Sequence, residues 1–195
     1  MRFGVDVSEH QAGFDFTACP LDFAIIRTTD GTYQDHAFPT LFVDAHSAGL
    51  NVSTYHFLRS PSEGTSVAEQ VEASVEVLQR APGAMNCPMW LDVESPAGLT
   101  LADVRSAYDT FQGFGVCVAG VYTNAWYWRR YMRLARPSQL GALWLADWGS
   151  NNPAFPGVDA WPTPLGMGTP EVWQYTSRGT IGGFTVDLNA WRDVA

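Results

Sequence analysis

Long apolar runs, cysteines and charged side chains are all scarce in this sequence. Charged residues make up 16% of the 195 residues and hydrophobic residues 46%, a balance typical of a compact globular chain rather than a disordered one. No segment approaches the roughly 20 apolar residues of a membrane span, so we expect no membrane partner. The N-terminal residues MRFGVDVSEHQ lack the apolar stretch of a signal peptide, and we therefore expect none.

The three cysteines, Cys19, Cys87 and Cys117, are far apart and form no CxxC pair, which argues against a redox motif and a zinc knuckle. Each lies among apolar residues, so we expect buried free thiols, with a Cys87–Cys117 disulfide as the open alternative. His56 has no second histidine at metal-ligand spacing. We therefore expect it to hydrogen-bond within the core, and we expect neither a metal nor a cofactor.

Two further motifs are missing, and basic residues are outnumbered. The GxSxG elbow is absent, and no glycine-rich phosphate loop follows the first apolar run. The net charge of −9, from 20 acidic and 11 basic residues, argues against nucleic acid as a partner.

Aromatic residues are instead abundant, with 8 Trp, 7 Tyr and 11 Phe. This excess over the needs of a small core suggests a groove that stacks flat faces such as sugar rings.

Short apolar runs recur along the chain, and each has the length and β-branched or aromatic content of a strand. Eight are found: FGVDVS at 3–8, FAIIRT at 23–28, VSTYHF at 52–57, MWLDVE at 89–94, CVAGVYTN at 117–124, ALWLADW at 142–148, EVWQYT at 171–176 and FTVDLN at 184–189. Helical patterns lie between them at 38–48, 65–80, 100–113 and 124–135, whereas the connections 149–170 and 177–183 have no helical period.

Strands that alternate with helices predict an α/β fold with a largely parallel sheet. We expect one domain, residues 1–195, forming an irregular (β/α) barrel of about eight mostly parallel strands with about five helices. The chain is shorter than the roughly 250 residues of a full eightfold barrel, so some crossovers should be bare loops. An open doubly wound sheet is the alternative.

Active sites of such barrels lie at the carboxyl ends of the strands. Acids, amides and aromatics gather at these positions here: Asp6, Arg27, Thr28, His56, Asp92, Glu94, Tyr122, Asn124, Asp147, Gln174, Tyr175, Asp187 and Asn189. Burying carboxylates costs stability unless they are paired or used. The expected barrel therefore has an acidic mouth at one end.

Asp92 and Glu94 form the strongest pair, because residues two apart on a strand point to the same side, roughly 6.5 Å apart. Cleavage of a glycosidic bond needs one protonated and one ionised carboxyl group. The pair alone is also compatible with two unrelated acids at a strand end. Asp6 and Asp187, on the first and last strands, should join the pair in a closed barrel, although either could instead cap a turn.

Five tryptophans lie near strand ends, and we expect most of them to be core residues and one or two to be platforms for sugar rings: Trp90, Trp126, Trp144, Trp148 and Trp173.

Seven segments, in order along the chain, resemble glycoside hydrolase family 25, a family of lysozymes. They are GVDVSEHQAGFDF at 4–16, YHFLR at 55–59, WLDVE at 90–94, GVYTN at 120–124, WLADW at 144–148, WQYTS at 173–177 and VDLNAW at 186–191. The resemblance implies cleavage of the β-1,4 bond between N-acetylmuramic acid and N-acetylglucosamine in bacterial peptidoglycan. We expect the enzyme to act on these glycan strands as a monomer.

The resemblance also implies roles for individual residues. Glu94 would be the proton donor, and Asp6, Asp92 and Asp187 would complete the acidic cluster. The sugar subsites would be lined by aromatic, amide and acidic side chains, namely Tyr55, Tyr122, Trp144, Gln174 and Asp147. The second carboxylate role is open, since the substrate's own acetamido oxygen could be the nucleophile, with Asp92 orienting it.

One departure and two alternatives accompany the resemblance. Thr28-Thr29-Asp30-Gly31 stands where relatives usually end in Ala-Thr-Glu-Gly, and the shorter side chain of Asp30 puts a groove-wall role in doubt. A non-catalytic glycan-binding barrel is one alternative. The other, a chitinase-like glycosidase, would need a DxxDxDxE signature, and the residues before Asp92 lack its earlier acids. Without a signal peptide, we expect a cytoplasmic protein released at lysis, as a phage lysin is, or one exported by another route.

Overall fold

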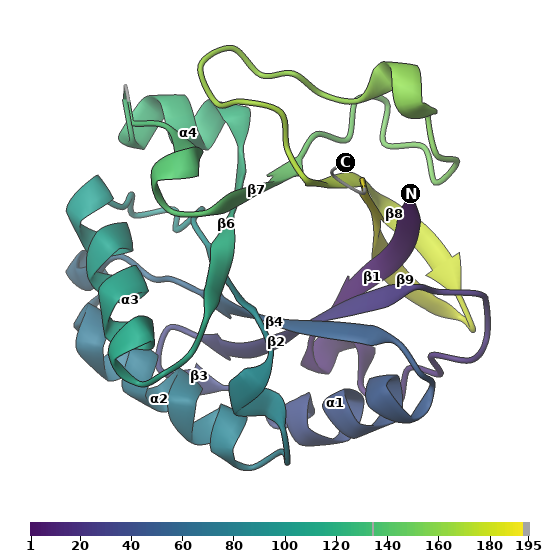
Figure 1. The fold of residues 1–195 in the computed structure, drawn as a ribbon, viewed down its shortest axis with the longest axis horizontal. Coiled ribbons are helices and arrows are strands. Elements are labelled where there is room, and N and C mark those ends of the chain that lie inside the picture. The colour runs from purple at the N-terminus through teal and green to yellow at the C-terminus, as the bar shows by residue number, and fades with distance from the viewer. Residues whose placement is uncertain (134, 193–195) are drawn as a thin grey trace.

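Eight strands close into a barrel in the computed structural model of the chain, which describes residues 1–133 and 135–192 (Figure 1). The sheet order is β1-β9-β8-β7-β6-β5-β4-β2-β3, and pairing of β1 with β2 closes the ring. The strands are β1 (Arg2–Val7), β2 (Phe23–Asp30), β3 (Tyr33–Gln34), β4 (Asn51–Phe57), β5 (Met89–Asp92), β6 (Val118–Asn124), β7 (Ala142–Ala146), β8 (Val172–Ile181) and β9 (Phe184–Trp191). The expected closed barrel is confirmed, with the short β3 added at the edge of β2.

The strand directions are mostly parallel, with one exception that bears on the site. β1, β2 and β4 through β8 run parallel to one another, while β9, between β8 and β1, is antiparallel to both. Residues 177–183, expected to be a bare connection, instead form the end of β8 and the turn into β9. That expectation was wrong because a ten-residue strand extends beyond the apolar run that marked it.

Four α-helices are present among the described residues, one fewer than the five or so expected: α1 (Phe38–Ser47), α2 (Val67–Gln79), α3 (Leu101–Gly113) and α4 (Ala125–Tyr131). A capping box begins α3, since Thr100 Oγ1 accepts from the Asp103 backbone N–H and the Asp103 carboxylate accepts from the Thr100 backbone N–H. The helix expected at 124–135 is shorter, because it ends at Tyr131. Gly49 follows α1 with a positive φ of 79°, a conformation that favours glycine at a helix end.

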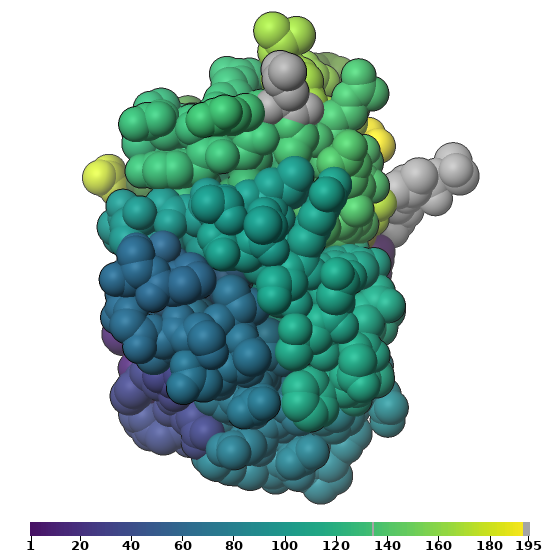
Figure 2. Space-filling model, turned by 90° about the vertical axis from the view of Figure 1, so that its left-hand side faces the viewer, coloured from purple at the N-terminus to yellow at the C-terminus, as the bar shows by residue number. Residues whose placement is uncertain are grey.

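The helices cover only part of the barrel. α1, α2 and α3 pack along one side, as Figure 1 shows, and Figure 2 views the molecule from the side on which the segments from α2 to α4 form the surface. The crossover from β7 to β8 carries no α-helix; a long loop with one 3-10 turn, Val158–Ala160, replaces it. The predicted absence of helical period at 149–170 is confirmed.

The largest side chains in the barrel interior are aromatic, with Ile25 and Val172 packed among them. Trp90 and Trp144 are fully buried there, with ring centroids 5.9 Å apart, and Trp191 lies 5.9 Å from Trp90. Four of the eight tryptophans are thus buried in the fold, namely Trp90, Trp128, Trp144 and Trp173. The layer between the sheet and the helices is instead built from valine, leucine and phenylalanine side chains.

The cysteines only partly follow the expectation. All three are free, so the Cys87–Cys117 disulfide does not form. Cys87 is buried and Cys19 is half-buried, but Cys117 is exposed, which contradicts its predicted burial. Cys117 lies immediately before β6, where the chain has not yet entered the covered part of the sheet.

His56 is fully buried in the layer between β4 and the helices. Its Nδ1 lies 2.6 Å from Thr29 Oγ1, and its ring packs edge-on against Phe111 of α3. The predicted hydrogen-bonding role in the core is thus confirmed. Burial lowers the pKa of His56 to about 3, so the side chain is neutral in the folded protein at neutral pH.

This burial predicts a pH dependence of stability. The unfolded histidine titrates near 6.5, so protons bind the unfolded chain first, and the free energy of unfolding falls as the pH drops from about 6.5 toward 3, by up to about 1.4 kcal/mol per pH unit. His56→Gln removes this contribution, and urea unfolding at about pH 7 and about pH 5 measures it. His46→Gln, an exposed histidine on α1, is the matched control. Equal pH dependence in the wild type and His56→Gln would contradict the prediction.

Candidate active site

A cleft of about 520 Å³ opens at the carboxyl ends of the parallel strands. It lies beside the start of α4 and the ends of β6 and β7, and antiparallel β9 contributes one acid. Its lining contains two carboxylates from the predicted cluster and two exposed tryptophans, in the set Glu94, Tyr122, Asn124, Ala125, Trp126, Ala146, Asp147, Trp148, Ser177 and Asp187. The other two predicted acids, Asp6 and Asp92, are buried and do not line it.

Asp6 and Asp187 face each other across the junction of β1 and β9. The antiparallel register pairs these two residues directly. Asp187 therefore reaches the site from the middle of its strand, and not from a carboxyl end as expected. Burial and the neighbouring Asp6 carboxylate raise the pKa of Asp187 to about 8, and the protonated Asp187 hydrogen-bonds Asp6. Two carboxyl groups in this contact disfavour simultaneous ionisation, so the arrangement favours one proton shared between them.

Two amide side chains donate hydrogen bonds to the Asp6 carboxylate. Asn189 Nδ2 and Gln174 Nε2 donate to Asp6 Oδ2 over 2.7 and 2.9 Å. Burial raises the pKa of Asp6, and these hydrogen bonds oppose the rise because they stabilise the charged form. Asn189 is in turn oriented by the indole N–H of Trp144, which donates to its side-chain oxygen over 2.8 Å.

Gln174 is the most highly connected side chain of the site. Its Oε1 accepts from the Tyr122 hydroxyl at 3.0 Å and from the Trp148 indole at 2.9 Å. Its Nε2 donates to Asp6 and, at 3.1 Å, to Asp187. The amide is buried, and two acceptor and two donor interactions use its hydrogen-bonding capacity. Gln174 therefore positions the carboxylates, and nothing in its geometry leaves it free to contact a sugar.

Asp92 and Glu94 lie at the end of β5, which stops at Asp92. Burial holds the pKa of Asp92 well above its usual range, and the charge of Glu94 raises it further. One oxygen of Asp92 has no hydrogen-bond partner among the described residues. Burial and the charge of Asp6 also raise the pKa of Glu94, while a hydrogen bond with Asn124 lowers it. The predicted pair is thus close enough to interact, with Glu94 at the cleft and Asp92 behind it.

Asn124 links the site to a helix start. Its side-chain oxygen accepts from the Tyr127 backbone N–H at 2.9 Å and so caps α4. The same side chain hydrogen-bonds Glu94. The geometry of the helix terminus therefore fixes a partner of Glu94.

Asp30 lies near this cluster through an irregularity in β2. The register shifts between Arg27 and Thr29, which brings Asp30 opposite Phe57, and Phe57 is itself opposite Asp92 on β5. Asp30 binds Arg59 through both oxygens, at 2.5 and 2.7 Å. An ion pair of Asp30 with Arg59 therefore lies beside the acidic cluster.

The residues predicted to contact sugar divide into three groups. Tyr122 and Asp147 line the cleft, Tyr55 is half-buried outside its lining, and Trp144 and Gln174 are buried beneath it. Trp126, 69% exposed, and Trp148, 41% exposed, are the two of the five considered tryptophans that line the cleft. Ser177 was missed, because residues 177–183 gave no strand signal.

The described part of the chain contains neither a metal-binding cluster nor a membrane-spanning helix. Residues 1–133 and 135–192 contain no group of His, Cys, Asp or Glu arranged to hold a metal ion. None of their helices is long and apolar enough to cross a membrane.

Comparison with known proteins identifies relatives of this arrangement. The family model for glycosyl hydrolases family 25 matches residues 5–184. Lysozyme M1 of Streptomyces globisporus is 27% identical over 95% of this chain, and the autolytic lysozyme of Clostridium acetobutylicum is 27% identical over 93%. The chain spans 65% and 52% of the lengths of these two proteins.

Solved structures share the fold. A muramidase from Acremonium alcalophilum superposes with a TM-score of 0.76 at 23% identity, covering 100% of this chain and 95% of that one. A family GH25 lysozyme from Aspergillus fumigatus gives a TM-score of 0.74 at 23% identity, covering 99% and 94%. At this identity the likeness shows the barrel fold, whereas the family model spans most of the sequence. The chain therefore belongs to glycosyl hydrolases family 25.

Proposed function

We propose that the protein is an N-acetylmuramidase that cleaves the β-1,4 bond between N-acetylmuramic acid and N-acetylglucosamine in peptidoglycan. The observation that carries this proposal is a cluster of four interacting acids with raised pKa values, in which Glu94 and Asp187 line the cleft and Asp6 and Asp92 are buried beside it. Such a cluster destabilises the fold at neutral pH, so chemistry is the better explanation for it. Family membership gives the substrate class.

Glu94 is the proton donor in this proposal. Burial and the charge of Asp6 raise its pKa and so favour the protonated form, and its place in the cleft lining lets it reach the leaving oxygen of the bound glycan. Proton transfer from Glu94 accompanies breaking of the bond between the anomeric carbon and that oxygen. Water then adds to the anomeric carbon, and the proton that it loses restores Glu94.

The remaining carboxylates have complementary tasks. Asp92 lies behind Glu94 and has one oxygen without a hydrogen-bond partner among the described residues, and its proposed task is to orient the substrate's 2-acetamido group. Asp6, held by two amide donors and by Asp187, carries the negative charge that stabilises positive charge developing on the sugar. Together these roles need no metal or cofactor.

Sugar binding is assigned to the exposed part of the cleft. Trp126 and Trp148 offer apolar faces for sugar rings, and Tyr122 and Asp147 offer polar groups beside them. We further propose that residues 1–195 form a single catalytic domain that works as a monomer, with peptidoglycan glycan strands as its partner.

The protein acts on the bacterial cell wall in this proposal. Relatives include an autolytic lysozyme, the catalytic domain of an endolysin from a bacteriophage of Listeria monocytogenes, and a spore cortex lytic enzyme of Clostridium perfringens. Release from the cytoplasm at lysis, as for a phage lysin, stays the preferred route, and export by another route stays the alternative.

The first test is Glu94→Gln, which keeps the size of the side chain but removes its acid. We expect release of new reducing ends from purified peptidoglycan to fall at least about a hundredfold, because protonation of the leaving group is lost. Mass spectrometry of the wild-type products should find muramic acid at the new reducing end. Glu171→Gln is the matched control, since Glu171 lies outside the cleft.

Two outcomes would favour the alternatives. A wild-type protein that binds peptidoglycan but releases no reducing ends at any pH would support the non-catalytic glycan-binding barrel. N-acetylglucosamine at the new reducing end would indicate a different bond specificity and overturn the muramidase proposal.

A second test addresses Gln174 as a positioning residue. Gln174→Met removes donors that hold Asp6 as an anion, so the pKa of Asp6 should rise and the acid side of the pH–kcat/KM profile should move to higher pH. We expect kcat to fall about tenfold or more while the protein stays folded. Gln112→Met, on the exposed face of α3, is the control. An unchanged pH profile with reduced activity would point to a purely structural role.

A third test asks whether the cluster is maintained at a cost to stability. The pKa of Asp187 is about 8 in the folded protein and near 3.8 in the unfolded chain. The contribution of Asp187 to the free energy of unfolding is therefore fully present below about pH 4 and is lost as the pH rises through 8. Asp187→Asn should therefore raise Tm relative to the wild type by about 3 °C or more near pH 8, with little gain near pH 4. The control is Asp109→Asn on α3, and a gain independent of pH would contradict the explanation.

A further inference from the structure

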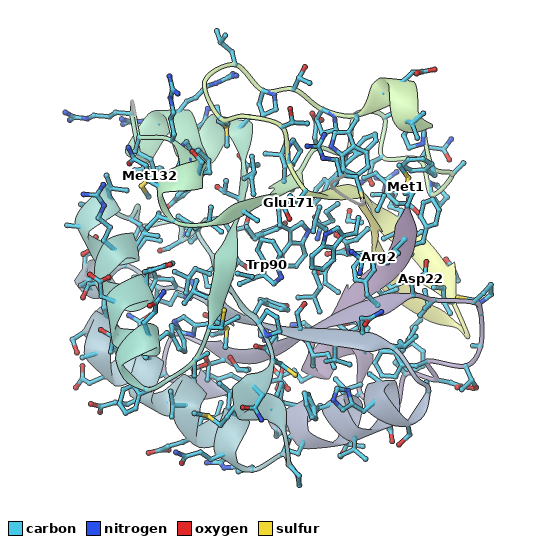
Figure 3. The ribbon with its side chains drawn as sticks, viewed as in Figure 1. Met1, Arg2, Asp22, Trp90, Met132 and Glu171 are labelled. Atoms are coloured by element: carbon cyan, nitrogen blue, oxygen red, sulfur yellow. The ribbon has the colours of Figure 1, made fainter. Side chains whose placement is uncertain are left out.

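Four arginines gather on one strip of an otherwise acidic protein. All eleven basic residues of the chain are arginines, and the net charge is −9. Arg129, Arg130, Arg133 and Arg136 lie within eight positions, in and just after α4, and all four are exposed. We call these residues the arginine patch. Figure 3 shows nitrogen-tipped side chains extending outward around α4.

The patch is not neutralised by the described part of the protein. The salt bridges described there involve Arg27, His36 and Arg59, and none involves a patch residue. Arg129 instead donates to the backbone oxygen of Leu165 at 3.4 Å, and Arg130 lies over the ring of Tyr131 at 5.5 Å. These contacts leave guanidinium groups available to an external anion.

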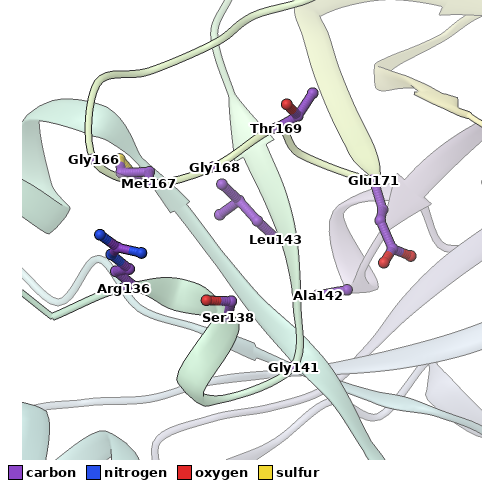
Figure 4. A pocket seen from close by; sticks show the side chains of 10 residues that line it. All are labelled: Arg136, Ser138, Gly141, Ala142, Leu143, Gly166, Met167, Gly168, Thr169 and Glu171. Atoms are coloured by element: carbon purple, nitrogen blue, oxygen red, sulfur yellow. The ribbon is translucent and has the colours of Figure 1, made fainter.

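The position of the patch relates it to the catalytic cleft. Trp126, one turn before Arg129 and Arg130, lines the cleft at the carboxyl ends of the strands. Arg136 lines a second hollow of about 370 Å³ next to Ala142, where β7 begins, and therefore at the opposite end of that strand. In Figure 4, Arg136 and the acid Glu171 lie on opposite sides of this hollow. The patch thus extends from the cleft along the side of the barrel.

We propose that the arginine patch binds a phosphodiester polyanion that is attached to the glycan strand lying in the cleft. This inference rests on the proposed function, and it adds the kind of wall on which the enzyme works best. A guanidinium group binds phosphate oxygens through two N–H donors, and four such groups in succession match a polymer with repeated charges better than they match one carboxylate. Continuity with the cleft favours a polymer joined to the substrate over a separate surface.

The test compares Arg129→Gln/Arg133→Gln with the charge-matched control Arg80→Gln/Arg178→Gln. Arg80 and Arg178 are exposed and lie outside the patch. Both pairs are placed in a Glu94→Gln background so that the wall stays intact, and binding is measured by co-sedimentation with Gram-positive walls. One wall sample keeps its phosphodiester polymers and the other loses them to cold hydrofluoric acid.

We expect the patch variant to bind intact walls about fivefold to tenfold more weakly than the control. The slope of log binding constant against log salt concentration should also become shallower by about one to two, because two cationic groups are removed. On stripped walls the two variants should bind equally, and long-chain inorganic polyphosphate should compete only for intact walls. Equal binding of both variants to intact walls would overturn the proposal. So would patch-dependent binding to anionic phospholipid vesicles that matches binding to walls, since a membrane would then be the partner.

Failure of this inference is separable from failure of the proposed function. With Glu94 present, release of reducing ends from stripped walls tests the muramidase activity without any polyanion. The arginine-patch pair should retain that release at the wild-type rate. A wild-type protein that is inactive on stripped walls would overturn the proposed function, whereas the binding comparison tests the patch alone.

Discussion

The site depends on how the protein holds the Asp6 carboxylate inside its barrel. A buried anion costs several kcal/mol unless hydrogen bonds replace its hydration. Here the amides of Gln174 and Asn189 donate to one oxygen of Asp6, and protonated Asp187 supplies a further bond. The other raised pKa values follow in part from this arrangement, because the retained charge of Asp6 opposes ionisation of Glu94 and Asp187.

The aromatic core explains why those amides are in place. An amide side chain can present either end, so its orientation must be set by its partners. Trp144 and Trp148 use their indole N–H groups, and Tyr122 its hydroxyl, to occupy the amide oxygens. The amide nitrogens are thereby turned toward Asp6. The tryptophans of the barrel therefore fill space and also set the direction of the donors that support the charge.

Periodicity in the sequence predicts the main elements well, since each strand and helix must bury one face. All eight strands and the Thr100–Asp103 capping box follow from local patterns. Local patterns predict neither the direction in which a strand runs nor how deeply a side chain is buried. Nothing in VDLN indicates that β9 runs antiparallel, and nothing distinguishes Trp144, inside the barrel, from Trp126 at the cleft. The direction of β9 is set by the hairpin turn at Gly182–Gly183, which lies outside this segment, whereas the depth of each tryptophan depends on residues far away in the sequence, as does the ion pair of Asp30 with Arg59.

The β8–β9 hairpin has a consequence for how catalytic competence arises during folding. Gln174, Asp187 and Asn189 lie on this one hairpin, whose pairing is local and whose turn is Gly182–Gly183. Their partner Asp6 is 183 residues away from Asn189, on the first strand. The pairing of β9 with β1 is therefore among the contacts with the highest loop-closure entropy in the chain. The same pairing places Asp187 opposite Asp6, so a chain in which β9 has not paired with β1 lacks the assembled acidic cluster.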